Sequence, residues 1–322
     1  MSISLFGQRA EVRPAYPIIL PGLSDSNNPA HWIDGNMAII QSFGLPMISR
    51  ISGSSGAFKA RPVPLNSYTH YPLWIESTWV DDSGVVYAWY HHESSACGGD
   101  LVTPEIGALI SSDGGHSFTD LGIIMESAYG PDCTSQNGYF AGGNGDFTVL
   151  LDSSREYFYF YFSNYSGPLD SQGLAVARLA FADRADPVGK AWKFFQGGWD
   201  EPGLLGRDTA ILPAHESWNS AYTDSFWGPS LHWNTFLNQY VMLLNRSCCE
   251  TGFPSEGIYV SFNPDLGDPG GWTLPEKILG ADEADWYPQV IGLEAGMTDK
   301  LAGETTRLFI KGESRWEIVF AH

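Results

Sequence analysis

Charged residues, and basic residues in particular, are scarce in this sequence. Only 17% of the 322 residues are charged, and 17 Lys and Arg stand against 37 Asp and Glu, for a formal net charge of −20. A nucleic-acid-binding surface needs Lys and Arg against the phosphates, and anionic membranes attract the same residues. The composition therefore argues against nucleic acids and membranes as partners.

Long hydrophobic runs are also absent. No stretch approaches the roughly 18 consecutive apolar residues that a transmembrane helix needs. The segment that begins at Met1 has neither the apolar core nor the cleavage site of a signal peptide. We therefore expect a cytoplasmic protein, or a secreted or periplasmic one whose signal peptide has been removed.

Cysteine is rare as well. Cys97, Cys133, Cys248 and Cys249 match no zinc-binding spacing. Cys97 and Cys133 lie in Gly-rich segments and could form a disulfide in an oxidising compartment. The adjacent Cys248 and Cys249 are expected to remain thiols.

Helical periodicity is nearly missing, because no long window places apolar residues at i, i+3, i+4 and i+7. Short alternating or aromatic-rich runs separated by Gly, Asp, Asn and Pro recur instead, which is typical of β-strands. Aromatic residues reach 14%, including 12 Trp and 15 Tyr. They suit packed sheets and also surfaces that stack on sugar rings. No linker-like segment divides the chain, so we expect a single domain over residues 1–322.

Five segments share one plan, in which a short strand, a turn and a very apolar second strand follow one another. A third strand that opens with small residues and a more variable fourth strand come next. Four-stranded sheets with two apolar faces bury those faces by stacking around an axis. We therefore predict an all-β fold, a five-bladed β-propeller with four-stranded antiparallel blades. The last blade is one strand short, and residues 10–19 could supply that strand and close the ring.

One motif has a sharp pattern. Ser111-Ser-Asp113-Gly-Gly115-His-Ser117-Phe118 matches the Asp-box, in which Asp and Gly form a tight hairpin and the aromatic side chain folds back beneath it. In proteins that carry this box it lies on the outer rim. We interpret Asp113 as structural.

Polar residues at the starts of the innermost strands should converge on one pocket, because those strands run along the propeller axis. The set contains carboxylates, histidines, amides and aromatics, a mixture suited to sugar hydroxyls and ring faces. Its members are Asn27, Asn28, His31, Glu76, Asn144, Asp146, Asp224, Trp227, Ser230, His232, Asp285, Tyr287 and Gln289.

Two short segments in this set resemble strands of a known group of enzymes. Gly145-Asp146-Phe-Thr-Val and Phe226-Trp227-Gly-Pro229-Ser230 are similar to strands of the five-bladed propeller glycoside hydrolases, the clan of arabinofuranosidases, β-xylosidases, arabinanases and fructan hydrolases (family 43-like). The resemblance implies a glycosidase acting on an oligosaccharide or polysaccharide fragment. It places a catalytic aspartate at Asp146.

The sequence departs from the pattern of that clan in two places. Asn27-Asn28-Pro29 stands where the clan would place Asp before Pro, and Ser230 stands where it has Asp. Some relatives hold an axial divalent cation such as calcium, for which His232 is a possible ligand. One histidine does not make a metal site, and a core histidine is the simpler interpretation. We therefore expect no metal cofactor.

Glycosidic cleavage needs one protonated and one ionised carboxyl group. Glu76 lies between Ile75 and Trp79 on an apolar strand, where burial would raise its pKa and favour the role of acid. Asp146, in a Gly-rich segment, would stay ionised and act as base or nucleophile. Asp224 would orient the substrate or tune the other two carboxyl groups. Equally, carboxylates at strand starts often bind only the amides of nearby loops.

The remaining candidates are predicted to contact substrate. His92 ends a second strand, Arg207 could clamp the substrate or pair with a surface acid, and Glu256 opens a third strand near the rim. The long segments 93–105, 126–143 and 197–225 should shape the mouth of the pocket. The predicted contacts are Asn28, His31, His92, Asn144, Arg207, Trp227, Ser230, His232, Glu256, Tyr287 and Gln289.

Two other functions stay open. The same pocket without an acid and base pair would make a carbohydrate-binding propeller that does not catalyse a reaction. The Asp-box also suggests a sialidase-like enzyme, but sialidases need an arginine cluster. Only Arg50, Arg207 and Arg246 are available in loops for it.

Overall fold

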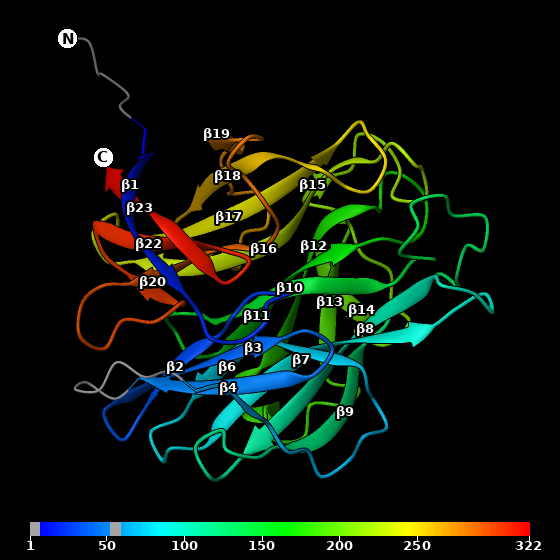
Figure 1. Cartoon of the computed structure of the whole chain (residues 1–322). Helices are drawn as coiled ribbons and strands as arrows, with labels where there is room; N and C mark the ends of the chain where they lie inside the picture. Colours follow the sequence, from blue (N-terminus) through cyan, green and yellow to red (C-terminus); the bar gives the residue numbers. More distant parts are fainter. Residues whose placement is uncertain (1–6, 52–58) are drawn as a thin grey trace.

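The computed structural model describes residues 7–51 and 59–322. Residues 1–6, the start of the segment in which we found no signal-peptide pattern, lie outside the described residues. Five sheets, each built on four antiparallel strands, surround a common axis, as predicted from the repeats (Figure 1). In the described chain the one helix is the 3-10 turn η1 (Phe181–Asp183). No helix there is long and apolar enough to cross a bilayer.

Each blade is ordered from the axis outward. The first blade consists of β2 (Ala30–Ile33), β3 (Asn36–Ser42), β4 (Pro46–Ile51) and β5 (Arg61–Pro62). The second blade consists of β6 (Leu73–Val80), β7 (Val86–Ser95), β8 (Val102–Ser111) and β9 (Thr119–Met125). The third blade contains β10 (Asn144–Leu151), β11 (Tyr157–Asn164), β12 (Gly173–Ala180) and β13 (Ala191–Phe195), extended by β14 (Gly198–Pro202) and by β15 (Leu212–Pro213) beside β12.

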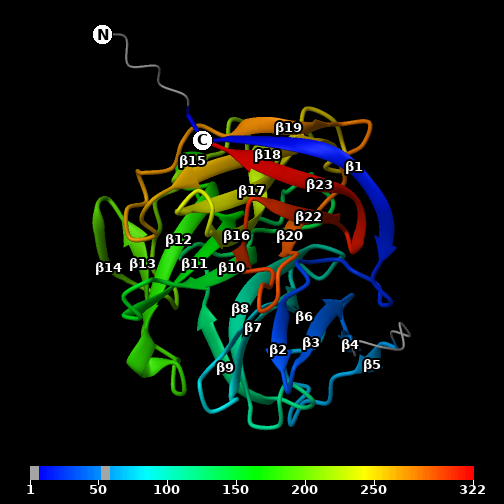
Figure 2. The ribbon, with the colours of Figure 1, turned by 90° about the vertical axis from the view of Figure 1, so that its left-hand side faces the viewer.

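The fourth and fifth blades complete the ring (Figure 2). The fourth consists of β16 (Asp224–Asn234), β17 (Gln239–Cys248), β18 (Ser255–Asn263) and β19 (Glu276–Gly280), with the short β21 (Leu301–Ala302) parallel to β16. The fifth consists of β20 (Pro288–Gly292), β22 (Thr305–Ile310), β23 (Glu313–Ala321) and β1 (Arg9–Ile19). The N-terminal strand therefore closes the last blade, as predicted, with Arg9 opposite Ala321.

The strand β11 shows why these sheets stack. Its sequence alternates Tyr and Phe, so the two residue types point to opposite faces of the sheet. Phe158 and Phe160 pack with Trp89 of the second blade, whereas Tyr159 and Tyr161 pack against the fourth blade. Both faces are buried, and only stacking between blades can bury both.

In the hairpin between β8 and β9, the side chain of Asp113 forms hydrogen bonds within the hairpin itself. Asp113 accepts hydrogen bonds from the Ser111 hydroxyl at 2.7 Å and the Ser117 hydroxyl at 2.6 Å, and Phe118 is buried beneath the turn. Burial alone would raise the pKa of Asp113, but the hydrogen bonds from Ser117 and Ser111 outweigh it and lower that pKa to about 2. The carboxylate therefore binds only groups of its own turn in these contacts. The assignment of this turn to the Asp-box class stays a prediction.

All four cysteines form disulfides. Cys97 is joined to Cys133, as the sequence allowed for an oxidising compartment. Cys248 is joined to its neighbour Cys249, so the expectation that these two remain thiols is wrong. Their positions at the end of β17, where the regular strand stops, allow the two adjacent sulfurs to meet.

Removing the Cys97–Cys133 bond should destabilise the protein. The bond closes a loop with a sequence separation of 36, for which loop-closure entropy predicts a loss of about 4 kcal/mol. We expect the Cys97→Ser/Cys133→Ser variant to show this loss in chemical denaturation. The matched Cys248→Ser/Cys249→Ser variant opens only a minimal ring and should lose much less. Equal losses in the two variants would contradict the prediction.

Candidate active site

Three of the innermost strands carry a β-bulge close to the mouth of the propeller. The register shifts lie between Ile75 and Ser77 in β6, between Gly145 and Phe147 in β10, and between Trp227 and Ser230 in β16. A bulge adds a residue to one strand and redirects its side chain, and bulges are common next to active sites. The extra residues in β6 and β10 are Glu76 and Asp146.

Asp146 has the more unusual backbone of the two. Its φ is +40°, a left-handed value that costs free energy in a residue with a side chain. The flanking Gly145 has no room for a Cβ, which would lie 2.8 Å from His91 and from Pro104. The chain is therefore packed tightly around a conformation that directs the Asp146 carboxyl toward the axis.

A pocket of about 80 Å³ lies at this mouth. Aromatic rings form most of its wall, and most of their contacts with one another are edge to face, as in Trp218 against Trp227 with ring centroids 6.3 Å apart. An engineered cavity of roughly 150 Å³ holds benzene, so a sugar ring enters this pocket only if side chains around it shift. The lining residues are Asp25, Glu93, Tyr139, Phe140, Asp146, Trp218, Trp227, Phe253, Trp286 and Tyr287.

The Asp146 carboxyl group is buried and has two neighbours of different kinds. The Tyr165 hydroxyl donates a hydrogen bond to Oδ2, and Nδ1 of His91 lies 3.9 Å from Oδ1. Burial raises the pKa of Asp146 to about 7; His91 opposes the rise and Glu76 adds to it. A carboxyl group with this pKa exchanges a proton near neutral pH.

Glu76 lies behind Asp146, outside the lining of the pocket. It is fully buried, and its Oε1 is 3.1 Å from Nδ1 of His91 while its Oε2 accepts a hydrogen bond of 2.9 Å from the Phe147 amide. Burial raises the pKa of Glu76 to about 8, against the effects of that amide and of Lys300. The predicted rise in pKa is present, but the side chain supports Asp146 and His91 and does not face the pocket.

Two further carboxyl groups face the pocket from other blades. Glu93, at the end of β7, lies 3.6 Å from Nε2 of His91, and burial raises its pKa, with His91 opposing and Asp146 adding to the rise. Asp25 precedes β2. Burial raises its pKa too, while the ammonium of Lys311 lowers it. Three blades therefore deliver one carboxyl group each to the same space.

The structure brings only part of the predicted set to this pocket. Asp146, Trp227 and Tyr287 line it. The Trp227 indole donates a hydrogen bond of 2.8 Å to the Ser247 hydroxyl, and Tyr287 has a φ of +59° immediately before β20. The expectation that residues near the starts of the innermost strands converge on one pocket therefore identified one lining residue each from the third, fourth and fifth blades.

Several predicted contacts are buried in the framework, and most of them form hydrogen bonds or close polar contacts with other parts of the protein. Asn28 and Gln289 bind each other, with Nε2 of Gln289 donating to the Asn28 carbonyl at 2.8 Å. Asn144 accepts a hydrogen bond from Lys193, and Ser230 is buried in β16. His31 and His92 lie near Thr78 Oγ1 (3.1 Å) and the Pro72 carbonyl (2.9 Å). These placements do not support direct contact with substrate.

Three other predicted residues form ion pairs away from the pocket lining. Asp224 accepts two hydrogen bonds from Arg246, at 2.8 and 2.9 Å. Arg207 binds Glu201 at the outer edge of the third blade. Glu256 binds Lys277 and the hydroxyl of Tyr259. Arg207 therefore pairs with a surface acid, and the catalytic role predicted for Asp224 is not supported by its position.

Sequence reasoning missed most of the wall. Asp25, Tyr139, Phe140, Trp218, Phe253 and Trp286 lie in loops outside the regular strand pattern. The long segments 93–105, 126–143 and 197–225 gave a partial signal, because they contribute Glu93, Tyr139, Phe140 and Trp218 to the pocket. Their individual residues carry no periodic pattern that could have selected them.

The arginines required by a sialidase-like site are not gathered here. Arg50 donates to the Gly114 carbonyl at 3.1 Å, and Arg207 and Arg246 pair with Glu201 and Asp224. None of the three lines the axial pocket. The pocket therefore lacks the positive charges that would bind a sugar carboxylate.

Two groups in the described chain offer three potential metal ligands, yet neither fits a divalent cation. One group consists of Asp224, Cys248 and Cys249, and its two sulfurs are joined in a disulfide. The other is Glu76, His91 and Asp146, whose donor atoms lie within 4.8 Å of one another but already face each other or a protein donor.

The axial histidine is also a poor ligand for a cation. His232 is buried, and neither ring nitrogen has a hydrogen-bond partner. Burial lowers its pKa to about 3, and the nearby ammonium of Lys300 contributes to that fall. A divalent cation beside His232 would be repelled by that ammonium, so the residues present do not fit an axial metal.

The raised pKa values predict how stability depends on pH. Glu76 and Asp146 have folded-state pKa values of about 8 and about 7, above their ordinary values of 4.5 and 3.8. The folded protein therefore holds protons that the unfolded chain releases, so their contribution to stability is full below about pH 4 and is lost as the pH rises through 7 and 8.

We expect the melting temperature of the Glu76→Gln variant to fall less between pH 5 and 8 than that of the wild type, because a neutral amide does not titrate. Thermal melts over this range make the comparison. Parallel pH profiles for the two proteins would contradict the prediction.

No protein-family model matches this chain, and no curated protein sequence matches it. Solved structures do match. An α-L-arabinofuranosidase from Podospora anserina has a TM-score of 0.55 at 11% identity, with 97% of each chain covered. A putative exo-β-1,3-galactanase from Bifidobacterium bifidum s17 has a TM-score of 0.54 at 13% identity, with 94% of this chain and 90% of that chain covered.

A third match is an exo-β-1,3-galactanase from Clostridium thermocellum, with a TM-score of 0.52 at 12% identity and 94% of this chain covered. The present chain spans only 62% of that chain's length. At such identities the likeness concerns the fold. The chain has the five-bladed β-propeller fold of these glycoside hydrolases.

Proposed function

We propose that the protein is a glycoside hydrolase whose active site is the axial pocket. The observation that carries the proposal is the meeting of Asp25, Glu93 and Asp146 within one aromatic-walled pocket. Aromatic rings with a few converging polar groups suit a sugar, and carboxyl groups with separated proton affinities supply the acid and the base. The bulge and the left-handed backbone at Asp146 support a role in the reaction.

The names of the matching structures point to the same substrate class. One fungal exo-β-1,3-galactanase was solved with β-1,3-galactotriose, and the arabinofuranosidase with cellotriose. We therefore propose an oligosaccharide, or a fragment of a polysaccharide, as the substrate of this chain. Neither a metal ion nor another cofactor takes part in the proposed reaction.

Asp146 is the proposed general acid. With a pKa raised to about 7, it holds a proton in mildly acidic solution and can pass it to the glycosidic oxygen as the bond to the anomeric carbon breaks. Tyr165 and His91 hold the carboxyl group in place, and Glu76 orients His91 from behind. Glu76 is thus a positioning residue.

Asp25 is the proposed carboxylate that assists attack on the anomeric carbon. Burial raises the pKa of Asp25, but the positive charge of Lys311 opposes that rise. Glu93 is in a different environment. Burial raises its pKa, His91 opposes the rise, and the carboxyl groups of Asp146, Asp25 and Glu76 all add to it. Asp25 therefore has a nearby ammonium that favours its ionised form, as the proposed carboxylate requires.

The test is a screen of aryl glycosides and of β-linked oligosaccharides with the wild-type protein, followed by purified Asp146→Asn and Asp25→Asn variants. Release of sugar that both substitutions suppress is the expected result. Sugar binding without turnover would instead support a carbohydrate-binding propeller. Full activity in both variants would contradict the assigned site.

The two disulfides also support a proposal about location. Disulfides persist in oxidising compartments and are rare in the cytosol, so we propose that the protein works outside the cytoplasm, in the periplasm or after secretion. Titration of free thiols in the protein from its natural source provides the test. Four free thiols would favour the cytoplasm.

A further inference from the structure

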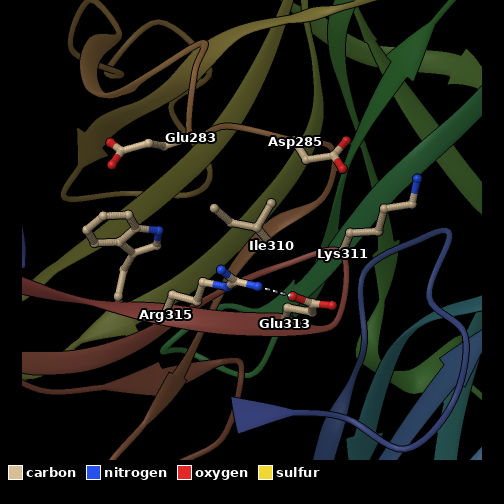
Figure 3. Close-up of a pocket in the computed structure, with 7 residues that line it drawn as sticks. Glu283, Asp285, Ile310, Lys311, Glu313 and Arg315 are labelled. Carbon is tan, nitrogen blue, oxygen red and sulfur yellow. Dashed lines mark hydrogen bonds and ion pairs between the residues drawn. The ribbon is translucent and has the colours of Figure 1, made fainter. Parts of the chain in front are cut away.

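A second pocket, of about 260 Å³, lies on the fifth blade between the segment before β20 and the hairpin that joins β22 to β23 (Figure 3). Lys311 is in that hairpin, and Figure 3 shows its side chain extending in the same direction as that of Asp285, with Glu283 on the other side of the pocket. The lining residues are Glu283, Asp285, Ile310, Lys311, Glu313, Arg315 and Trp316.

This pocket, which we call the blade pocket, adjoins the axial one. Asp285 lines the blade pocket and the next residue, Trp286, lines the axial pocket. Nζ of Lys311 lies 5.1 Å from the centre of the Trp286 ring, so Lys311 and Trp286 form a shared wall. Lys311 and Asp285 also act electrostatically on Asp25, on the axial side. The two pockets therefore lie on either side of Lys311 and Trp286, close enough for successive units of one oligosaccharide to occupy both.

The lining suits neutral sugar hydroxyls. The carboxylates of Glu283 and Asp285 can accept hydrogen bonds and the Lys311 ammonium can donate them, and a hydroxyl group does both. Glu313 and Arg315 form an ion pair of 3.5 Å with each other at the edge of this lining. Within the described chain, Lys311 forms no ion pair and Glu283 has no side-chain partner, so both are available to a ligand. Trp316 is half-buried and adds an apolar surface. Because both signs of charge are present, a charged sugar would be attracted by one side of the pocket and repelled by the other.

We infer that the blade pocket binds the units of a neutral oligosaccharide that extend beyond the axial pocket. The inference rests on the proposed function for its substrate class. It assigns to this protein a preference for an oligosaccharide over a single sugar, which the narrow axial pocket alone does not provide.

The test measures binding by calorimetry in the Asp146→Asn background, where turnover is suppressed. The probes are galactose against β-1,3-galactotriose, and glucose against cellotriose. We expect one trisaccharide to bind at least roughly tenfold more tightly than its monosaccharide. Trp316→Ala should lower this ratio of affinities roughly tenfold. Glu283→Gln should lower it several-fold. Trp192→Ala, at an exposed tryptophan of β13, is the matched control and should keep the ratio.

The outcomes separate the two proposals. Loss of the ratio in Glu283→Gln, a surface change that leaves the core intact, supports the blade pocket even if Trp316→Ala does not fold. Unchanged ratios in both variants, equal affinity for trisaccharide and monosaccharide, or no sugar binding would overturn the inference. If the wild type fails to cleave any glycoside while the ratio behaves as expected, the proposed hydrolysis is wrong and the blade pocket stands.

Discussion

Replacing Asp146 with asparagine is expected to lower kcat/KM for any substrate found by roughly 10²–10⁴-fold, the usual contribution of a general acid. The amide has nearly the same shape as the carboxyl group but cannot supply the proton. It can still accept the hydrogen bond from Tyr165, which contacts Oδ2 in the wild type. Initial rates over a range of substrate concentrations measure the effect.

The control for this substitution is Asp82→Asn, because the Asp82 side chain is 91% exposed and its carboxylate lies 3.8 Å from Arg155 on the surface. This variant should retain the wild-type rate. A loss below about threefold in Asp146→Asn, in a protein with an unchanged melting temperature, would contradict the role of Asp146. An equal loss in both variants would point to a general effect of lowered negative charge.

Replacing Lys193 with methionine is expected to destabilise the fold by about 3–5 kcal/mol, since breaking a buried ion pair leaves the remaining charge without compensation. The Lys193 side chain is fully buried on β13. Its ammonium donates to the Glu126 carbonyl, Asn144 Oδ1 and the Gly206 carbonyl at 2.7, 2.8 and 3.0 Å, and lies 3.6 Å from Asp208. The residue therefore ties two long loops to the start of β10.

Thermal unfolding should show the effect of Lys193→Met as a fall of about 5–10 °C in melting temperature. Lys190→Met is the matched control, because Lys190 pairs with Asp183 and Asp186 on the surface. Exposed ion pairs contribute about 0.2–1 kcal/mol, so this control should change little. Adding Asp208→Asn to Lys193→Met should recover part of the loss. Similar melting temperatures for the two single variants would contradict the prediction.

The fold could be predicted from the sequence because its signals are local and repeated. The alternation of Tyr and Phe in β11 predicts a strand that is buried on both faces, and five similar segments predict the number of blades. The last blade is one strand short in the sequence, and this predicted that β1 would complete it. Each of these features follows from the spacing of apolar residues, which the stacked blades require.

The site could be predicted only where a residue begins an innermost strand. Asp146 and Tyr287 were found in this way, whereas Asp25 and Trp218 lie in loops whose paths depend on contacts with other loops. The same limit explains why several predicted contacts lie away from the pocket lining. Asn144 appears free in the sequence but is bound by Lys193, which lies 49 positions away, and no local pattern indicates such a partner.

The pairing of β1 with β23 sets a condition on biosynthesis. Arg9 pairs with Ala321, and a ribosome that adds roughly 5–20 residues per second needs about 15–60 s to deliver the second partner after the first. The nascent N-terminal segment must wait through that interval without joining another chain. Its sequence contains Glu11, Arg13, Pro14 and Pro17, and charges and prolines of this kind discourage strand pairing between molecules. The residues that delay association during synthesis later form the outer edge of the finished ring.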